Sequence, residues 1–166
     1  MAATDPKSRK PSGASSSSTP KPPENLVLFL DEGLGQHVIA RALRNSGVRV
    51  EIHSDHFRPG ELDEVWLADV AGRGWIVLAK DYRIRYRELA LRAIRRAGAC
   101  VFVLKRSADL RADEMAAIFV NALPGIYRAA DGEPPPFIAK VGKDGSVAVW
   151  WPERPKASRK KRPEAG

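Results

Sequence analysis

Acidic residues follow three apolar segments of this sequence at the point where each segment ends. Asp31 closes the run "VLFL", Asp55 follows "VRVEIHS", and Asp81 follows "WIVLAK". A fourth acidic pair, Asp63 and Glu64, opens a segment with helical periodicity. Carboxylates gathered in one cleft repel one another unless a cation lies among them. Their oxygens suit Mg²⁺ or Mn²⁺, and such an ion activates a bound water and stabilises charge on a phosphoryl oxygen.

Each of these acids also has a plainer interpretation, as the end of a strand or the cap of a helix. Asp31 and Glu32 precede a predicted helix, and acidic residues near a helix N-terminus are stabilised by its dipole. The coincidence of three strand ends nevertheless favours a cation site. We assign Asp31 to that site and expect Glu32 to face solvent or to assist the start of the helix.

The segments that must position these acids alternate between strands and helices. Apolar runs predict strands over 26–30, 75–79 and 100–105, and alternation of apolar and polar residues predicts a strand over 48–54. Helical periodicity predicts helices over 34–47, 62–74, 83–98 and 111–123. Segments 137–141 and 146–150 flank "GKDG" and predict a hairpin, appended to the fold or at its edge. The pattern predicts a three-layer α/β/α fold with a mainly parallel central sheet, plus a C-terminal β-hairpin. Ligands of such sheets bind at the carboxyl ends of the strands.

Basic residues surround Asp81 in the sequence. Lys80 precedes it, and Arg83 and Arg85 follow within a strongly basic predicted helix. Arginine pairs bidentately with phosphate oxygens, so a phosphodiester backbone is the ligand that this surrounding favours. We therefore predict that Lys80, Arg83 and Arg85 bind substrate.

Two histidines, His53 and His56, flank Asp55. Their spacing permits a transition-metal site, but two histidines around one aspartate are a weak signal for zinc. A histidine that hydrogen-bonds a carboxylate or contacts RNA is the favoured interpretation. Both are therefore predicted as substrate-binding residues.

Composition separates a folded unit from two polar ends. Residues 1–25 and 152–166 are rich in Ser, Pro, Lys and Arg and are predicted to be flexible tails, which leaves a domain over 26–151. Of the net charge of +8, the tails carry +2 and +4. Cys100 lies in an apolar run and is expected to be a buried, inert thiol. No apolar run approaches about 18 residues and no signal peptide is evident, so we expect a cytoplasmic protein without a membrane span.

With these residues in place, the sequence resembles the PIN-like domain superfamily, in particular the branch of VapC-type toxins and Mut7-C-like proteins. The resemblance covers about residues 26–105. It rests on "FLDEGLG…IARALRNSGVRVEIHSDHF" and on "LDEVWLADVAGRGWIVLAKD", where "LAKD" takes the place of a common Thr-x-Asp. The resemblance implies the fold described above and a ribonuclease that depends on Mg²⁺ or Mn²⁺.

Residue by residue, the resemblance implies that Asp31, Asp63 and Asp81 are the catalytic acids and hold the metal ion. Glu64 is an alternative for Asp63, because its spacing fits as well. A further acid that many PIN nucleases carry on an inserted helix is missing here, and Asp55 takes its place. An antitoxin partner and a homodimer are also implied by the family.

Two other functions compete with this one. A non-catalytic PIN-like module could bind nucleic acid or a protein through its basic helix and tails. A phosphoryl-transfer receiver domain also clusters acids at strand ends, but it leaves Asp55 and Asp63 without a role. A dinucleotide enzyme is disfavoured because "DEGLGQH" lacks the third glycine of the phosphate-binding fingerprint.

Overall fold

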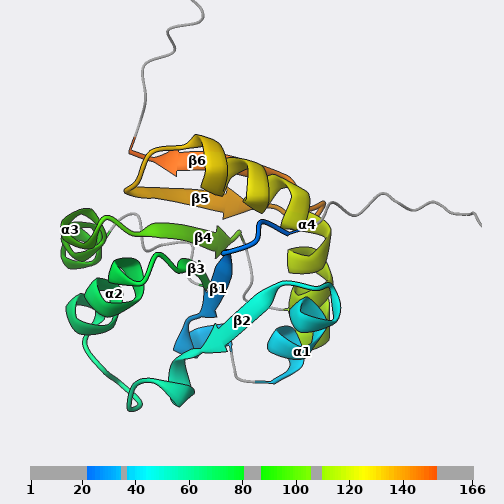
Figure 1. Ribbon diagram of the computed structural model, residues 1–166, viewed down its shortest axis with the longest axis horizontal. Coiled ribbons are helices and arrows are strands. Elements are labelled where there is room, and N and C mark those ends of the chain that lie inside the picture. Colours follow the sequence, from blue (N-terminus) through cyan, green and yellow to red (C-terminus); the bar gives the residue numbers. More distant parts are fainter. Residues whose placement is uncertain (1–21, 35–36, 81–86, 106–109, 153–166) are drawn as a thin grey trace, which may run out of the picture.

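The computed structural model describes residues 22–34, 37–80, 87–105 and 110–152 of the chain. Six strands form one sheet in the order β2-β1-β3-β4-β5-β6 (Figure 1). The strands are β1 (Val27–Leu30), β2 (Arg49–Ile52), β3 (Ile76–Ala79), β4 (Cys100–Leu104), β5 (Phe137–Val141) and β6 (Val147–Trp151). All neighbouring pairs are parallel except β5 and β6. The predicted mainly parallel sheet is confirmed.

In the described part of the chain, four α-helices cover the two faces of this sheet. They are α1 (Val38–Asn45), α2 (Asp63–Gly72), α3 (Glu88–Ala97) and α4 (Ala112–Gly132), and two short 3-10 helices, η3 (Glu32–Leu34) and η4 (His53–Asp55), follow β1 and β2. Helices α1 and α4 pack together on one face, and α2 and α3 on the other (Figure 1).

Alternate strand residues feed two separate cores, as a period of two requires. Leu28 and Leu30 point into the core beneath α1 and α4. Phe29 points into the core beneath α2 and α3. Every residue of β1 is therefore buried, which explains its continuous apolar run and confirms the three-layer fold.

The connections define a switch point between β1 and β3. From β1 the chain crosses one face through α1 to β2, and it returns across the other face through α2 to β3 on the far side of β1. The two strands are joined at their ends by the Asp31 amide, which donates to the Leu78 carbonyl at 2.9 Å. Crevices at such switch points, outside the carboxyl ends of the strands, are where open α/β sheets bind ligands.

The C-terminal hairpin differs in part from the expectation of an appendage. Strand β5 pairs parallel with β4 as the fifth strand of the central sheet, and only β6 is an antiparallel edge strand. The predicted turn is confirmed: Gly145 has φ 85° and its amide donates to the Gly142 carbonyl at 2.9 Å. The hairpin belongs to the sheet because α4 carries the chain across a face between β4 and β5.

Helix α4 is longer than the predicted segment 111–123 and continues through Pro124 to Gly132. A proline inside a helix costs about 3 kcal/mol. Burial of Phe119, Leu123 and Ile126 along one face of the helix offsets this cost. The apolar stripe therefore continues past the residue at which local propensity predicts an end.

The remaining boundaries shift by a few residues. Helix α1 begins at Val38 rather than at 34, because η3 precedes it, and helix α3 begins at Glu88, while residues 83–86 lie outside the described residues. Cys100 is buried as expected, and burial raises the pKa of its thiol to about 11. Among the helices described, none is long and apolar enough to cross a membrane.

Candidate active site

Asp31 lies directly after β1 at the switch point of the sheet. Its amide and carbonyl are both engaged, the amide with Leu78 and the carbonyl with the amide of Leu34, which closes the turn of η3. These bonds fix the backbone, so the side chain leaves the sheet at a defined position. A Cβ placed on Gly33 would lie 3.6 Å from Oδ2 of Asp31 and 3.9 Å from Cβ of Lys80. The ends of β1 and β3 therefore meet at this point.

The Asp31 carboxyl has a pKa above its ordinary value. Burial raises it most, and the nearby charge of Asp63 raises it further, while the backbone amides of Glu32 and Gly33 and the charge of His53 act in the opposite direction. A partly buried carboxylate beside a second carboxylate is unfavourable without a cation. The hydrogen bonds from the Glu32 and Gly33 amides also connect the Asp31 carboxylate to the start of η3. Asp31 therefore caps this short helix in addition to lying at the candidate site.

Asp63, at the start of α2, lies near enough for its charge to act on the Asp31 carboxyl. Its plainer interpretation as a helix cap does not hold, because the N-cap residue is Leu62 and no side chain makes a capping hydrogen bond to α2. Asp63 is instead the first helical residue, and its Oδ1 accepts a hydrogen bond of 3.1 Å from the Trp66 indole nitrogen. Trp66 is buried, so this bond holds the carboxylate at the start of α2.

Glu32 is 48% exposed, which agrees with the expectation that it faces solvent or assists the helix start, and it also contacts the loop before α2. It begins η3, and its carboxylate accepts the Gly60 amide at 3.2 Å and 3.3 Å through its two oxygens. This contact ties the end of β1 to the loop before α2. The sequence gives only a weak signal for this contact. Glu32 is a second acid after the strand, and Gly60 lies in a turn 28 residues later.

His53 is buried rather than presented at the surface. Only 3% of it is exposed, and its ring packs against Phe29, Phe57 and Trp66 at centroid distances of 6.2 Å, 5.4 Å and 5.8 Å. Its Nε2 lies 4.0 Å from Oε1 of Glu32, beyond hydrogen-bond distance. This position differs from the predicted contact with substrate, because a side chain inside an aromatic cluster offers no surface to a large ligand.

His56 is held on the same loop by two contacts. Its Nε2 donates to Oε1 of Glu51 at 2.7 Å, and its ring meets Trp75 edge-on at 5.2 Å. The hydrogen bond to a carboxylate is the one that the sequence analysis favoured over a zinc site. Its side chain remains 25% exposed.

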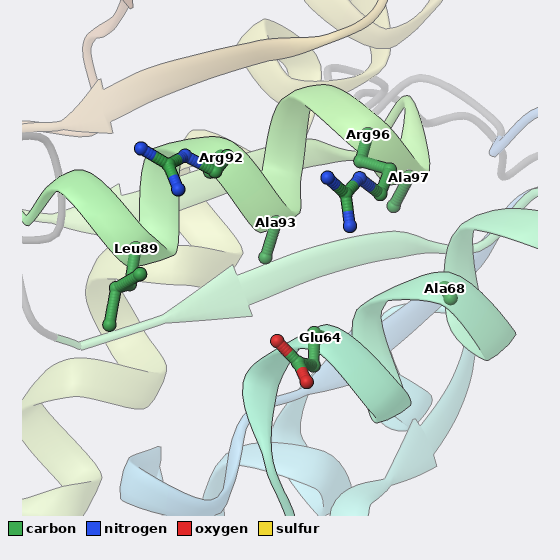
Figure 2. Close-up of a pocket in the computed structure, with 7 residues that line it drawn as sticks. All are labelled: Glu64, Ala68, Leu89, Arg92, Ala93, Arg96 and Ala97. Carbon is green, nitrogen blue, oxygen red and sulfur yellow. The ribbon is translucent and has the colours of Figure 1, made fainter.

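The other two predicted metal ligands that the structure describes, Asp55 and Glu64, have surroundings of their own. Asp55 is exposed on η4 and is not among the groups that shift the pKa of Asp31. Glu64 lines a groove between α2 and α3, opposite Arg96 (Figure 2). The two acids that open α2 thus face different surroundings.

The third predicted catalytic acid, Asp81, lies outside the described residues, as do Arg83 and Arg85. Lys80, the residue before Asp81, is described and lies beside Gly33 and Asp31. Among the described residues, no three His, Cys, Asp or Glu side chains gather closely enough to hold a metal ion. Two carboxylates are still a donor set that suits Mg²⁺, which keeps several waters and uses one or two carboxylates together with substrate phosphates.

Comparison with known proteins agrees with this arrangement. The family described as "PIN like domain" matches residues 26–106. A protein of Mycobacterium tuberculosis named as a candidate ribonuclease, VapC45, is 33% identical over 138 residues, which cover 78% of this chain and 99% of the relative. The chain belongs to the PIN-like domain family. No solved structure matches it significantly.

The part of the chain that matches the family contains four of the six strands of the sheet, β1 to β4. Residues 26–106 extend from the start of β1 to just beyond β4, and they include Asp31, Asp63 and Asp81. Helix α4 and strands β5 and β6 lie beyond this match and complete the sheet on the side away from β2. The candidate site therefore lies within the portion that defines the family.

Proposed function

We propose that this PIN-like domain is a metal-dependent endoribonuclease and the toxin of a toxin–antitoxin pair. The observation that carries the proposal is the meeting of Asp31 and Asp63 at the switch point of the sheet, where the charge of Asp63 raises the pKa of Asp31. The relative named as a candidate ribonuclease supports the same activity. The antitoxin and a homodimer come from the family resemblance, and the cytoplasmic location stays a prediction from the sequence.

The residues divide into two roles in this proposal. Asp31, Asp63 and Asp81 hold Mg²⁺ or Mn²⁺, which when bound supplies an activated water and charge stabilisation at the phosphoryl group. The Trp66 indole orients Asp63, and the amides of Glu32 and Gly33 orient Asp31. Lys80, beside Asp31, and Arg83 and Arg85 after it in the sequence bind the phosphates that flank the scissile bond.

Cleavage of a labelled RNA by the purified chain tests this proposal. With Mn²⁺ or Mg²⁺ we expect cleavage that EDTA abolishes, and we expect D31N and D81N each to lower the rate by about 100-fold or more, because each removes a ligand charge. Asp131→Asn, an exposed change on α4, is the matched control and should cleave like the wild type. Circular dichroism of all variants checks that the fold is intact.

Comparison of D63N with E64Q decides which acid at the start of α2 takes part, and we expect only D63N to lower the rate. The proposal fails if neither metal supports cleavage, or if D81N cleaves as fast as the wild type. RNA binding that depends on salt but is unaffected by EDTA and by these substitutions would favour the alternative, a non-catalytic PIN-like module that binds nucleic acid or a protein.

A further inference from the structure

A cavity of about 370 Å³ lies at the amino ends of β1 and β3. Its wall combines the segment before β1, the start of β3 and the end of α4. Asp31 follows the carboxyl end of β1, so the cavity and the candidate active site lie at opposite edges of the sheet. The volume falls within the range of small-molecule sites, which is about 300–1,000 Å³. The described residues that line the cavity are all outside the predicted catalytic and substrate-binding set.

Much of the cavity wall is apolar and already in place. Ile76 and Tyr127 are each only 7% exposed, and Leu26 and Ala130 are half-buried beside them. The Leu26 amide donates to the Pro23 carbonyl at 3.1 Å, which holds the segment before β1 in a turn. A ligand with hydrocarbon groups therefore leaves water for an apolar surface that needs little rearrangement.

The hydroxyl of Tyr127 is buried and makes no hydrogen bond within the part of the chain that the structure describes. A buried polar atom without a partner is costly, and such atoms in proteins usually have one. The hydroxyl is the terminal group of a side chain that lines the cavity, so a ligand there is placed to supply the missing bond. A phenol oxygen can accept that bond from an N–H group.

The charged side chains in the cavity wall are both carboxylates. Glu24 lines it from the segment before β1 and Asp131 from the end of α4, and both are exposed. Neither has an ion-pair partner among the residues that the structure describes. None of the described lining residues is Lys, Arg or His. Anions such as nucleotides are therefore repelled from this wall, and cations are attracted to it.

We infer that this cavity binds a small organic cation, an ammonium or a guanidinium carried on a short hydrocarbon chain. Its N–H groups meet Glu24, Asp131 and the Tyr127 hydroxyl, and its hydrocarbon chain covers Ile76 and Leu26. A neutral hydrocarbon would leave the carboxylates and the hydroxyl without a partner, and an inorganic cation would leave the apolar wall uncovered. The inference goes beyond the proposed ribonuclease activity and does not depend on it.

Butylguanidinium is the probe, and butylurea, which has nearly the same shape without the charge, is the matched control ligand. Each is titrated into the isotope-labelled full chain, and amide chemical shifts give the dissociation constant and the place of binding. We expect shifts in 23–26, 74–76 and 127–131. Butylguanidinium should bind about fivefold or more tightly than butylurea.

Two double variants with the same change of charge test the carboxylates. E24Q/D131N should raise the dissociation constant of butylguanidinium about fivefold or more. D69N/E88Q, at exposed residues of α2 and α3 on the far side of the sheet, should leave it within about twofold.

Tyr127→Phe tests the hydroxyl, because it removes that group and keeps the ring. We expect the dissociation constant of butylguanidinium to rise about threefold or more. The ligand-free variant should unfold at the same temperature as the wild type or higher, because a buried hydroxyl without a partner is lost. Weaker binding by a variant of undiminished stability cannot be attributed to a damaged fold.

A side chain of the chain itself is a second source of the same chemistry, since Lys21 directly precedes the described residues. Tighter binding of the probe to K21Q would identify Lys21 as the resident cation, and equal binding would identify a free small molecule as the ligand. The inference is overturned by the absence of binding, by equal binding of butylurea, by equal effects of the two double variants, or by wild-type affinity of Tyr127→Phe.

Discussion

At the scale of single residues, Asp31 is unfavourably placed in the absence of a cation. Burial and the charge of Asp63 both raise the pKa of its carboxyl. Between the ordinary pKa of aspartate and this raised value, the folded state binds more protons than the unfolded state. The free energy of unfolding therefore falls as pH rises through that interval. Such a penalty is typical of a residue kept for function rather than for stability.

We predict that Asp31→Asn stabilises the metal-free chain at pH 7. Asparagine removes the desolvated charge but keeps an oxygen for the amides of Glu32 and Gly33, so we expect the free energy of unfolding to rise by about 1 kcal/mol. Urea unfolding in EDTA at pH 7 and at pH 3 measures this, and the gain should vanish at pH 3. Destabilisation at pH 7 would mean that the main contribution of Asp31 is to cap η3.

At the scale of elements, the second half of α4 depends on a close approach to β6. A Cβ placed on Gly125 would lie 2.8 Å from Cγ2 and 3.1 Å from Cβ of Val147. Valine has few rotamers with which to move away. Glycine at this position therefore serves helix–strand packing, although it is a poor helix former.

Gly125→Ala is predicted to destabilise the protein by about 1–2 kcal/mol, because overpacking outweighs the gain in helix propensity. The same substitution in a Val147→Ala background should be neutral or stabilising, because the opposing methyl groups are gone. Chemical unfolding of the four proteins of this double-mutant cycle measures the coupling. If Gly125→Ala changes the free energy of unfolding equally in both backgrounds, the contact with Val147 is not the reason that position 125 requires glycine.

At the scale of the whole molecule, positive charge lies mainly outside the folded unit. The C-terminal tail, residues 153–166, carries six Lys and Arg residues against two acids. It lies outside the residues that the structure describes. Trp151, shortly before the tail in the sequence, lies next to α3, because Arg95 of this helix lies over its ring at 5.1 Å from the centroid. The charges of the tail are thus attached near a basic helix, where they can add to the attraction of a polyanion.

Deletion of residues 153–166 is predicted to weaken RNA binding without changing thermal unfolding. Each phosphate contact adds about 0.7 to the slope of log affinity against log salt for a single strand, so the slope should become shallower by up to about 4. A tail of equal length with Gln in place of Lys and Arg is the control that separates charge from length. An unchanged slope after deletion would mean that the tail serves solubility alone.

The sequence by itself determined the element types and the edge of the sheet that carries the acids. Apolar runs and helical stripes reflect local burial, so strands 26–30 and 75–79 and the acids that follow them could be predicted from periodicity alone. The end of α4 could not, because burial of Ile126 beyond Pro124 depends on the sheet beneath it.

The tertiary structure determined which strands and which side chains are neighbours. Strand order brings β1 next to β3, and α2 starts where the charge of Asp63 acts on the Asp31 carboxyl. The aromatic cluster buries His53, and the loop at Gly60 engages Glu32. The strand order, the burial of His53 by Phe29 and Trp66, and the contact of Glu32 with Gly60 leave no local pattern, because each joins segments whose meeting depends on how whole faces pack. The physical reason is that periodicity specifies which face of an element is buried but not which element covers it.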